Sequence, residues 1–142
     1  MREILFKAKR KDNGEWVEGH LIQSPYMDEV RSWISTPDDK TRLRAIATYY
    51  ADWRAVEVRT DTICQYTGLT DKNGNKIWEN DVCNCIYDGR LSIRVIIWDK
   101  DELDFKGTND KKNYGKEFDY LGCCEEIEVI SNIFDNPKLI GG

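Results

Sequence analysis

Short segments in which hydrophobic and polar residues alternate follow one another along the chain, separated by turn residues. Residues 2–9 alternate in this way. One side of this segment is apolar: Ile4, Phe6 and Ala8. WVEGHLIQ continues the pattern after Asn13-Gly14, and a period of two is typical of half-buried strands. Asn-Gly is a strong hairpin signal because both turn positions can require a positive φ. The start of the chain therefore predicts a β-hairpin.

QYTGLTDKNGNKIWENDV, residues 65–82, predicts a second hairpin. Asn73-Gly74 marks its turn. We expect Trp78 to face the core. We expect Asp81 to accept hydrogen bonds from local backbone amides where the chain turns into the next strand.

VCNCIY (82–87) and LSIRVIIW (91–98) predict a third hairpin, with its turn at Asp88-Gly89. The second of these strands is expected to present one alternating apolar face: Leu91, Ile93, Val95 and Ile97. A last apolar segment, EEIEVISNIFDN, precedes Pro137.

Residues 24–60 give a weaker pattern. A capped helix start at Ser35-Thr36-Pro37 predicts a short helix near 38–51, although RAIATYY also suits an extended chain. A strand is expected at 53–58. Together these elements predict a mainly β fold (α+β with a minor helix), whose antiparallel hairpins form a small barrel-like or sandwich domain.

Composition narrows the class of protein. A chain of 142 residues with 16 aromatic residues predicts one globular domain. No apolar run approaches the roughly 20 residues that span a bilayer, and no signal peptide is visible, so we expect a cytoplasmic protein with no membrane partner. The odd count of 5 Cys favours reduced thiols over a disulfide framework.

The net charge of −5 is unevenly distributed. Residues 1–60 carry 11 Lys/Arg and 10 Asp/Glu, whereas residues 61–142 carry 10 and 16. The negative half would repel phosphate backbones, which argues against general nucleic-acid binding. The basic run KAKRK (Lys7, Lys9, Arg10 and Lys11) is the exception, and its simplest explanation is a solvated strand end.

Two ligand-binding loops fail on spacing within residues 65–82. An EF-hand loop beginning at Asp71 would need Gly where Lys76 stands and Glu where Val82 stands. A P-loop would need a different glycine spacing, and Ser or Thr after its Lys. Neither calcium nor nucleotide binding is predicted.

Cysteine and histidine chemistry is weakly supported. Zinc could be held by four thiolates, although neither cysteine pair has the usual knuckle spacing: Cys83, Cys85, Cys123 and Cys124. His20 is the single histidine, so a Cys–His dyad rests on it alone, and an exposed strand histidine is the favoured interpretation.

Two sets of acidic residues are candidates for catalysis. Glu79 and Asp81 fit turn formation better than acid–base chemistry. Asp99, Asp101, Glu102 and Asp104, with Lys106, could bind Mg²⁺ in a metal-dependent hydrolase, but a solvated connection is the favoured interpretation of this Asp99–Lys106 cluster.

Three motifs together resemble the YopX-like family of phage and prophage proteins. QYTGLTDKNGNKIWENDV is similar to the family's central motif, REILFKAK followed by WVEGHLI to its start, and IEVISNIFDNPKL to its end. The chain has Cys64, Asn80 and Ser131 where the family usually has Gly; Asn tolerates left-handed backbone best of these. The resemblance implies a single domain over 1–142, with variable insertions near 24–60 and 99–122.

The resemblance implies no catalytic residue, and no metal or cofactor is expected. It implies a phage-encoded accessory protein, so a non-enzymatic module that binds a host or phage protein, and that can self-associate, is the expected function. A nucleic-acid-binding small β-barrel and the hydrolase are the alternatives. Binding is expected at Gln65, Tyr66 and Thr67. A structural role is expected for the remaining motif residues: Gly68, Asn73, Gly74, Trp78, Glu79, Asp81, Asn132 and Pro137.

Overall fold

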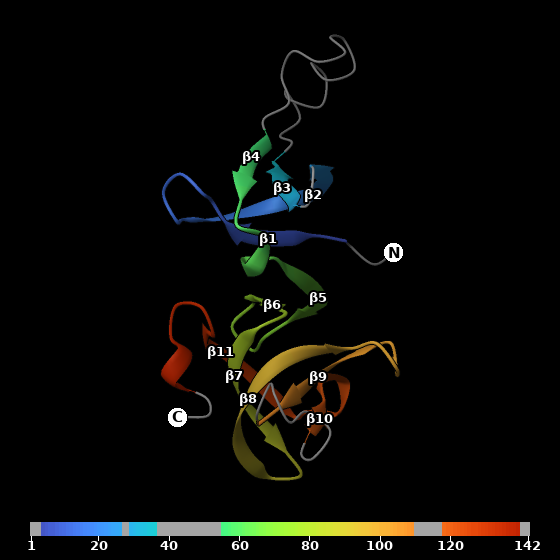
Figure 1. Ribbon diagram of the computed structural model, residues 1–142. Coiled ribbons are helices and arrows are strands. Elements are labelled where there is room, and N and C mark those ends of the chain that lie inside the picture. The colour runs from blue at the N-terminus through green and yellow to red at the C-terminus, as the bar shows by residue number, and fades with distance from the viewer. Residues whose placement is uncertain (1–3, 27–28, 37–54, 110–117, 140–142) are drawn as a thin grey trace. The chain divides into compact units, whose positions relative to one another are not determined.

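The computed structural model describes residues 4–26, 29–36, 55–109 and 118–139 (Figure 1). In these ranges the chain is mainly β, its strands pair antiparallel, and its helical segments are short 3-10 turns, so the predicted fold class is confirmed. The helix predicted near 38–51 lies outside the described residues. The chain divides into two compact units, Met1–Gln65 and Tyr66–Gly142. A single domain over 1–142 stays a prediction.

The N-terminal unit contains an open antiparallel sheet in the order β4-β3-β2-β1-β5. Its strands are β1 (Phe6–Lys9), β2 (Trp16–Tyr26), β3 (Glu29–Ser35), β4 (Ala55–Val58) and the start of β5 (Cys64–Thr70). A 3-10 turn, η1 (Thr60–Thr62), precedes β5. The strand expected at 53–58 is present from Ala55 onward, and residues 53 and 54 lie outside the described ranges.

Alternation decides which side chains form the core of this unit. Ala8, Ile34 and Val58 are fully buried, and Val17 and Leu21 pack against them. These residues all belong to the apolar set of their strands, as the period of two predicts. Gly19 lies so close to β3 that a Cβ there would overlap the carbonyl oxygen of Ser35.

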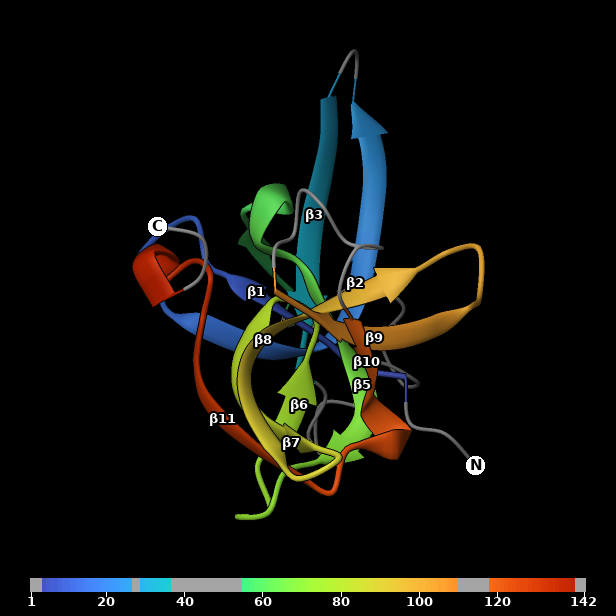
Figure 2. The same cartoon turned by 90° about the horizontal axis from the view of Figure 1, so that it is seen from below.

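The C-terminal unit contains a five-stranded open sheet in the order β10-β9-β8-β7-β11. These strands are β7 (Asp81–Tyr87), β8 (Arg90–Asp99), β9 (Asp104–Thr108), β10 (Phe118–Tyr120) and β11 (Glu126–Asn132). β6 (Lys76–Trp78) pairs with the second half of β5. Two 3-10 turns complete the unit: η3 (Leu121–Cys123) and η4 (Pro137–Leu139). Figure 2 shows β11 beside β7 at one edge of the sheet.

One face of this sheet forms a second core. Its buried residues come from four strands and η3: Ile77, Cys83, Cys85, Ile96, Phe105 and Leu121. Trp78 is also buried, as predicted. None of the helices in the described part of the chain is long and apolar enough to cross a membrane.

The apolar face predicted for residues 91–98 is only partly correct. Val95 and Ile97 are buried, but Leu91 is 66% exposed and Ile93 is 44% exposed. β9 pairs with β8 only from Val95 to Asp99, so the first half of β8, where Leu91 and Ile93 lie, extends beyond the end of β9. Alternation alone could not show where the neighbouring strand stops.

The Asn-Gly dipeptides lie in hairpin turns, but only the glycine of each has the positive φ that both positions can require. Gly14 and Gly74 have φ of 74° and 83°, whereas neither Asn has a positive φ. Side chains complete these longer turns: Oδ1 of Asn13 accepts a hydrogen bond from the Glu15 amide at 2.9 Å. A single left-handed glycine after such a turn is enough to close the hairpin.

Candidate functional site

Asp71 anchors the turn between β5 and β6. Its Oδ1 accepts hydrogen bonds from the amides of Asn73 and Asn75, each at 2.9 Å. Its Oδ2 accepts one from the Val129 amide on β11 at 3.0 Å. Burial would raise the pKa of Asp71, but the hydrogen bonds from Val129, Asn75 and Asn73 together hold this pKa below its ordinary value. The turn is therefore joined to β11 by a buried carboxylate.

Lys72 makes a second connection between the same two segments. Its amide donates a 3.0 Å hydrogen bond to the carbonyl of Ile127. Its ammonium lies 3.8 Å from Glu126 and 3.5 Å from Glu128. These pairs are exposed, so they orient the lysine without contributing much stability.

A bulge in β5 directs Leu69 away from the sheet. The register between β5 and β6 shifts between Tyr66 and Thr70, and Gly68 has a φ of 88°. The Thr67 hydroxyl donates to the Ile77 carbonyl at 2.7 Å and accepts from the Leu69 amide at 3.2 Å. Leu69 is left 41% exposed.

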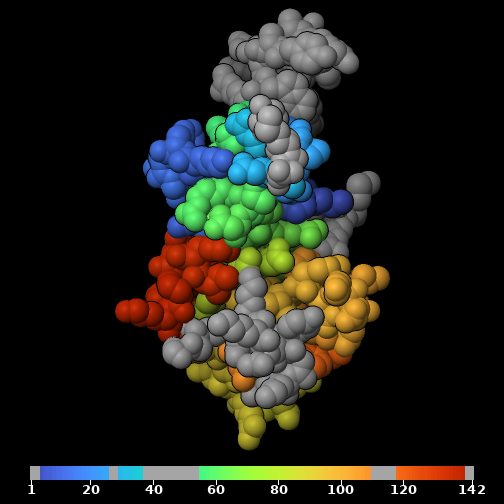
Figure 3. All heavy atoms as spheres, in the orientation of Figure 1, coloured from blue at the N-terminus to red at the C-terminus, as the bar shows by residue number. Residues whose placement is uncertain are grey.

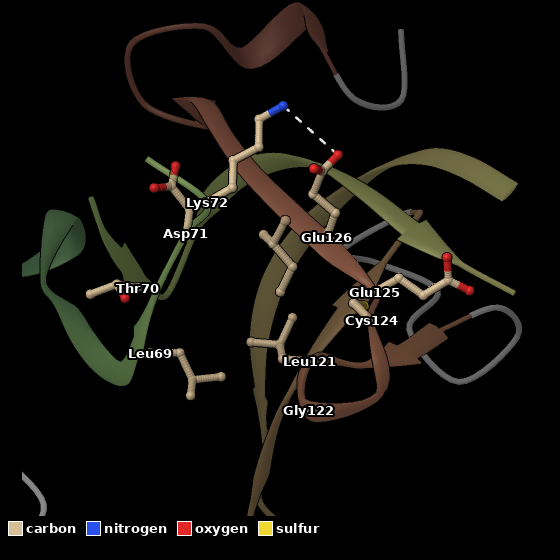
Figure 4. Close-up of a pocket in the computed structure, with 10 residues that line it drawn as sticks. Leu69, Thr70, Asp71, Lys72, Leu121, Gly122, Cys124, Glu125 and Glu126 are labelled. Atoms are coloured by element: carbon tan, nitrogen blue, oxygen red, sulfur yellow. Dashed lines mark ion pairs between the residues drawn. The ribbon is translucent and has the colours of Figure 1, made fainter. Parts of the chain in front are cut away.

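Leu69 forms one wall of a pocket of about 430 Å³ (Figure 4). We call it the Leu69 pocket. It is lined by Leu69, Thr70, Asp71, Lys72, Leu121, Gly122, Cys124, Glu125, Glu126 and Ile127. This volume lies within the range of natural ligand sites. Its lining is about equally polar and apolar, because aliphatic side chains share it with four charged residues.

The opposite wall comes from η3 and the start of β11. In Figure 4, Leu121 and Gly122 lie across the open space from Leu69. The turn is closed by a 3.2 Å hydrogen bond from the Cys124 amide to the Leu121 carbonyl. Glu125 points away from the pocket, and its Oε1 accepts a 3.1 Å hydrogen bond from the Gly89 amide.

Cys124 brings a thiol to the Leu69 pocket. It is half-buried and packs against the core that contains Cys83 and Cys85. A hydrogen bond from Cys85 lowers the pKa of Cys124. The same bond, followed by burial, raises the pKa of Cys85. Of these three thiols, Cys124 therefore loses its proton most readily.

The three residues expected to bind a ligand come shortly before Leu69 in the chain, but they do not line its pocket. Gln65 is half-buried, and Tyr66 and Thr67 are buried. Tyr66 packs on Trp78, with ring centroids 5.4 Å apart. A binding role for these residues stays a prediction. Leu69, two positions later, is the residue of this motif that the bulge exposes.

The remaining motif residues lie at turns. Oδ2 of Asp81 accepts a 2.8 Å hydrogen bond from the Trp78 amide, as predicted for the start of β7. Asn80 has a φ of 72°, which fits a position where glycine is common. Oδ1 of Asn132 accepts bonds from the amides of Phe134 and Asp135 at 3.0 and 2.9 Å.

The other four motif residues lie in or next to turns. Asn73 and Gly74 lie in the exposed turn that Asp71 anchors, and Gly74 supplies its positive φ. Pro137 opens η4. Glu79 is half-buried next to Asn80.

Lys106 pairs with two carboxylates of the acidic cluster that suggested Mg²⁺. Its buried ammonium lies 2.8 Å from Asp99 and 2.7 Å from Glu102, and it faces the ring of Phe118 at 4.2 Å. The hydrogen bonds from Lys106 lower the pKa of both carboxyl groups. The favoured interpretation of a solvated connection is therefore wrong for Asp99, which is buried.

The other candidate groups are dispersed. Cys83 and Cys85 are buried whereas Cys123 is exposed, and the described residues contain no cluster of three or more metal-ligating side chains. His20 is exposed on β2. The ammonium groups of Lys7 and Lys9 lie over the Trp16 ring at 4.6 and 5.4 Å.

A buried ion pair between two strands is not predicted by the sequence pattern. Arg94 of β8 lies 3.0 Å from Asp119 of β10, although β9 separates these strands. Gly107 on β9 allows this contact, since a Cβ there would lie 3.0 Å from Cβ of Arg94. An arginine in an apolar strand pattern was the available signal, but its partner is remote in sequence.

Comparisons with known proteins agree with the fold. A crystal structure of protein EF1440 from Enterococcus faecalis is similar, with a TM-score of 0.51 and 18% identity over 99% of this chain and 100% of that chain. At this identity the likeness shows the fold alone. None of the curated proteins compared with the chain matches it significantly. The family model described as YopX protein matches residues 5–141, nearly the whole chain, and the chain therefore belongs to the YopX family.

Proposed function

We propose that this protein is a phage- or prophage-encoded accessory protein that acts by binding another polypeptide chain at the Leu69 pocket, without catalysing a reaction. The observation that carries this proposal is the pocket itself, about 430 Å³ with walls from Leu69, Leu121 and Ile127. Concave apolar sites with a few polar groups are the usual form of a binding site.

The surroundings of the pocket support binding by a preformed surface. Asp71 and Lys72 join the β5–β6 turn to β11 through hydrogen bonds of 3.0 Å. A wall held in this way loses little conformational entropy when a partner binds, which favours affinity. The carboxylate of Asp71 is occupied with backbone amides, so it serves this scaffold.

Charge favours a polypeptide over a nucleic acid as the partner. Three acidic residues and one lysine belong to the pocket lining, although Glu125 directs its carboxylate away from the open space: Asp71, Glu125, Glu126 and Lys72. Their net negative charge would repel a phosphate backbone. The nucleic-acid alternative would use the N-terminal basic run instead, where Lys11 pairs with Glu57 at 3.1 Å and Arg10 with Asp12 at 2.8 Å.

A photocrosslinking amino acid at position 69 tests the proposal in cells that produce the phage proteins. We expect a discrete polypeptide adduct, which disappears when Gly122→Leu fills the pocket. The same crosslinker at position 103, an exposed leucine on another turn, is the matched control. Equal adducts at both positions, or an adduct that survives Gly122→Leu, would contradict binding at this pocket.

A further inference from the structure

The turn between β7 and β8 and the strand residues next to it expose three large apolar side chains. We call residues 87–93 the β7–β8 tip. Its exposed apolar side chains are Tyr87, Leu91 and Ile93, at 40%, 66% and 44%. Figure 3 shows this olive-coloured segment at the molecular surface. Clustered exposed apolar residues commonly mark an interaction site.

The charge next to Leu91 distinguishes it from other exposed aliphatic residues. Arg90 precedes Leu91 and is also exposed. Leu103 is 72% exposed but lies between Glu102 and Asp104. The β7–β8 tip also contains the exposed Asp88, but the residues that flank Leu91 itself are Arg90 and Ser92, so this leucine lies beside a cation.

The Leu69 pocket has the complementary character. Leu69, Leu121 and Ile127 supply apolar walls, and the carboxylates of the lining outnumber its one ammonium group, that of Lys72, which lies 3.8 Å from Glu126. A leucine side chain that enters the pocket would bury apolar area. An arginine next to it, at the rim, would meet opposite charge. An acidic segment such as the one around Leu103 would instead be repelled.

The tip and the pocket are neighbours within the same unit. The Gly89 amide in the tip donates a 3.1 Å hydrogen bond to Glu125, which belongs to the pocket lining. In a two-fold dimer, a contact of one subunit with the other is repeated in reverse. Because tip and pocket are close together, one two-fold axis can bring each tip to the partner's pocket.

We propose that two copies of this chain form a reciprocal dimer in which Leu91 of each copy enters the Leu69 pocket of the other and Arg90 faces Glu126. This inference rests on the proposed function, since it names a second copy as the polypeptide that the pocket receives. Each dimer contains two identical tip-to-pocket contacts.

Sedimentation velocity over a range of protein concentrations tests the dimer with the full chain. We expect a monomer–dimer equilibrium that Leu91→Asp and Leu69→Asp each weaken by at least about tenfold. Leu103→Asp is the matched control for adding a charge at an exposed leucine, and it should leave the equilibrium unchanged. Circular dichroism spectra establish that the variants are folded.

Two combinations identify the contact itself. Arg90→Glu and Glu126→Lys should each weaken the dimer, and together they should restore it, because the reversed pair is again attractive. Mixing Leu91→Asp with Leu69→Asp should yield more dimer than either variant alone, since one heterodimer contact then joins an intact tip to an intact pocket.

A wild-type protein that stays monomeric at all concentrations would overturn this inference, as would a dimer that is indifferent to Leu91→Asp or shows no gain in the mixture. Assembly beyond the dimer would overturn the reciprocal geometry. These outcomes leave the proposed function to be decided by crosslinking from position 69, where an adduct with a different polypeptide would support it.

Discussion

The Val129 amide donates a 3.0 Å hydrogen bond to Oδ2 of Asp71, a residue 58 positions earlier in the chain. This bond joins the β5–β6 turn, which forms one wall of the Leu69 pocket, to β11, whose first residues belong to the opposite wall. A single buried carboxylate thereby links a local turn to the tertiary structure.

Asp71→Asn should lower the free energy of unfolding by about 1–3 kcal/mol, because an amide group can no longer accept at both oxygen positions and leaves a backbone donor unsatisfied. Urea denaturation of the full chain measures this change. Asp101→Asn, at an exposed position in another turn, should stay within about 0.5 kcal/mol of the wild type. Equal stability of the two variants would contradict the anchoring role.

The contact between Arg94 and Asp119 gives a second prediction. Asp119→Ala should reduce the free energy of unfolding by roughly 3–5 kcal/mol, because it leaves a buried guanidinium group without its carboxylate. The double variant Arg94→Met/Asp119→Leu should be more stable than Asp119→Ala. In the double-mutant cycle of Arg94→Met and Asp119→Leu, additive effects would show that the two side chains do not interact.

Two glycines should respond differently to alanine. Gly19→Ala would place a Cβ against the backbone carbonyl of Ser35, so it should destabilise the protein by about 3 kcal/mol. Gly122→Ala meets no atom within 4 Å and should change stability by no more than about 0.5 kcal/mol. Thermal unfolding of both variants measures the difference, and similar melting temperatures would refute it.

Glu57 should make the free energy of unfolding depend on pH in the acidic range. Hydrogen bonds from Arg31 and then Lys11 lower the pKa of Glu57 from 4.5 to about 2. A lowered pKa in the folded state gives stability that is complete above pH 4.5 and is lost as the pH falls through 2. The stability difference between wild type and Glu57→Gln should therefore shrink over this interval, measured by urea denaturation at each pH. A pH-independent difference would contradict the shift.

Thiol labelling should single out Cys124 within its cluster. Its lowered pKa and partial exposure favour reaction with iodoacetamide, whereas burial and a raised pKa protect Cys83 and Cys85. Mass spectrometry of the native protein should find Cys124 modified before these two, which should react only after unfolding. Early labelling of Cys85 would show that the core opens readily.

Much of the fold could be predicted locally. The period of two identified the strand segments, and Asn-Gly identified both hairpin turns. Trp78 and Asp81 took the positions expected of them because their roles depend on neighbours within three residues. Asn80 likewise has the left-handed backbone that its short polar side chain tolerates.

The candidate site depended on contacts between distant segments. Leu69 lines a pocket because a bulge turns it outward and because η3 lies opposite, neither of which alternation can indicate. Leu91 is exposed because β9 ends at its pairing with Val95. Lys106 and Asp99, expected in a solvated loop, form a buried ion pair.

The sequence by itself determined the strands, the turns and the family, since periodicity and turn chemistry act over a few residues. Only the tertiary structure decided which side chains of those strands are covered, which charges meet, and where a pocket opens. Burial and pairing depend on strands brought together from far along the chain, and that information is absent from any one segment.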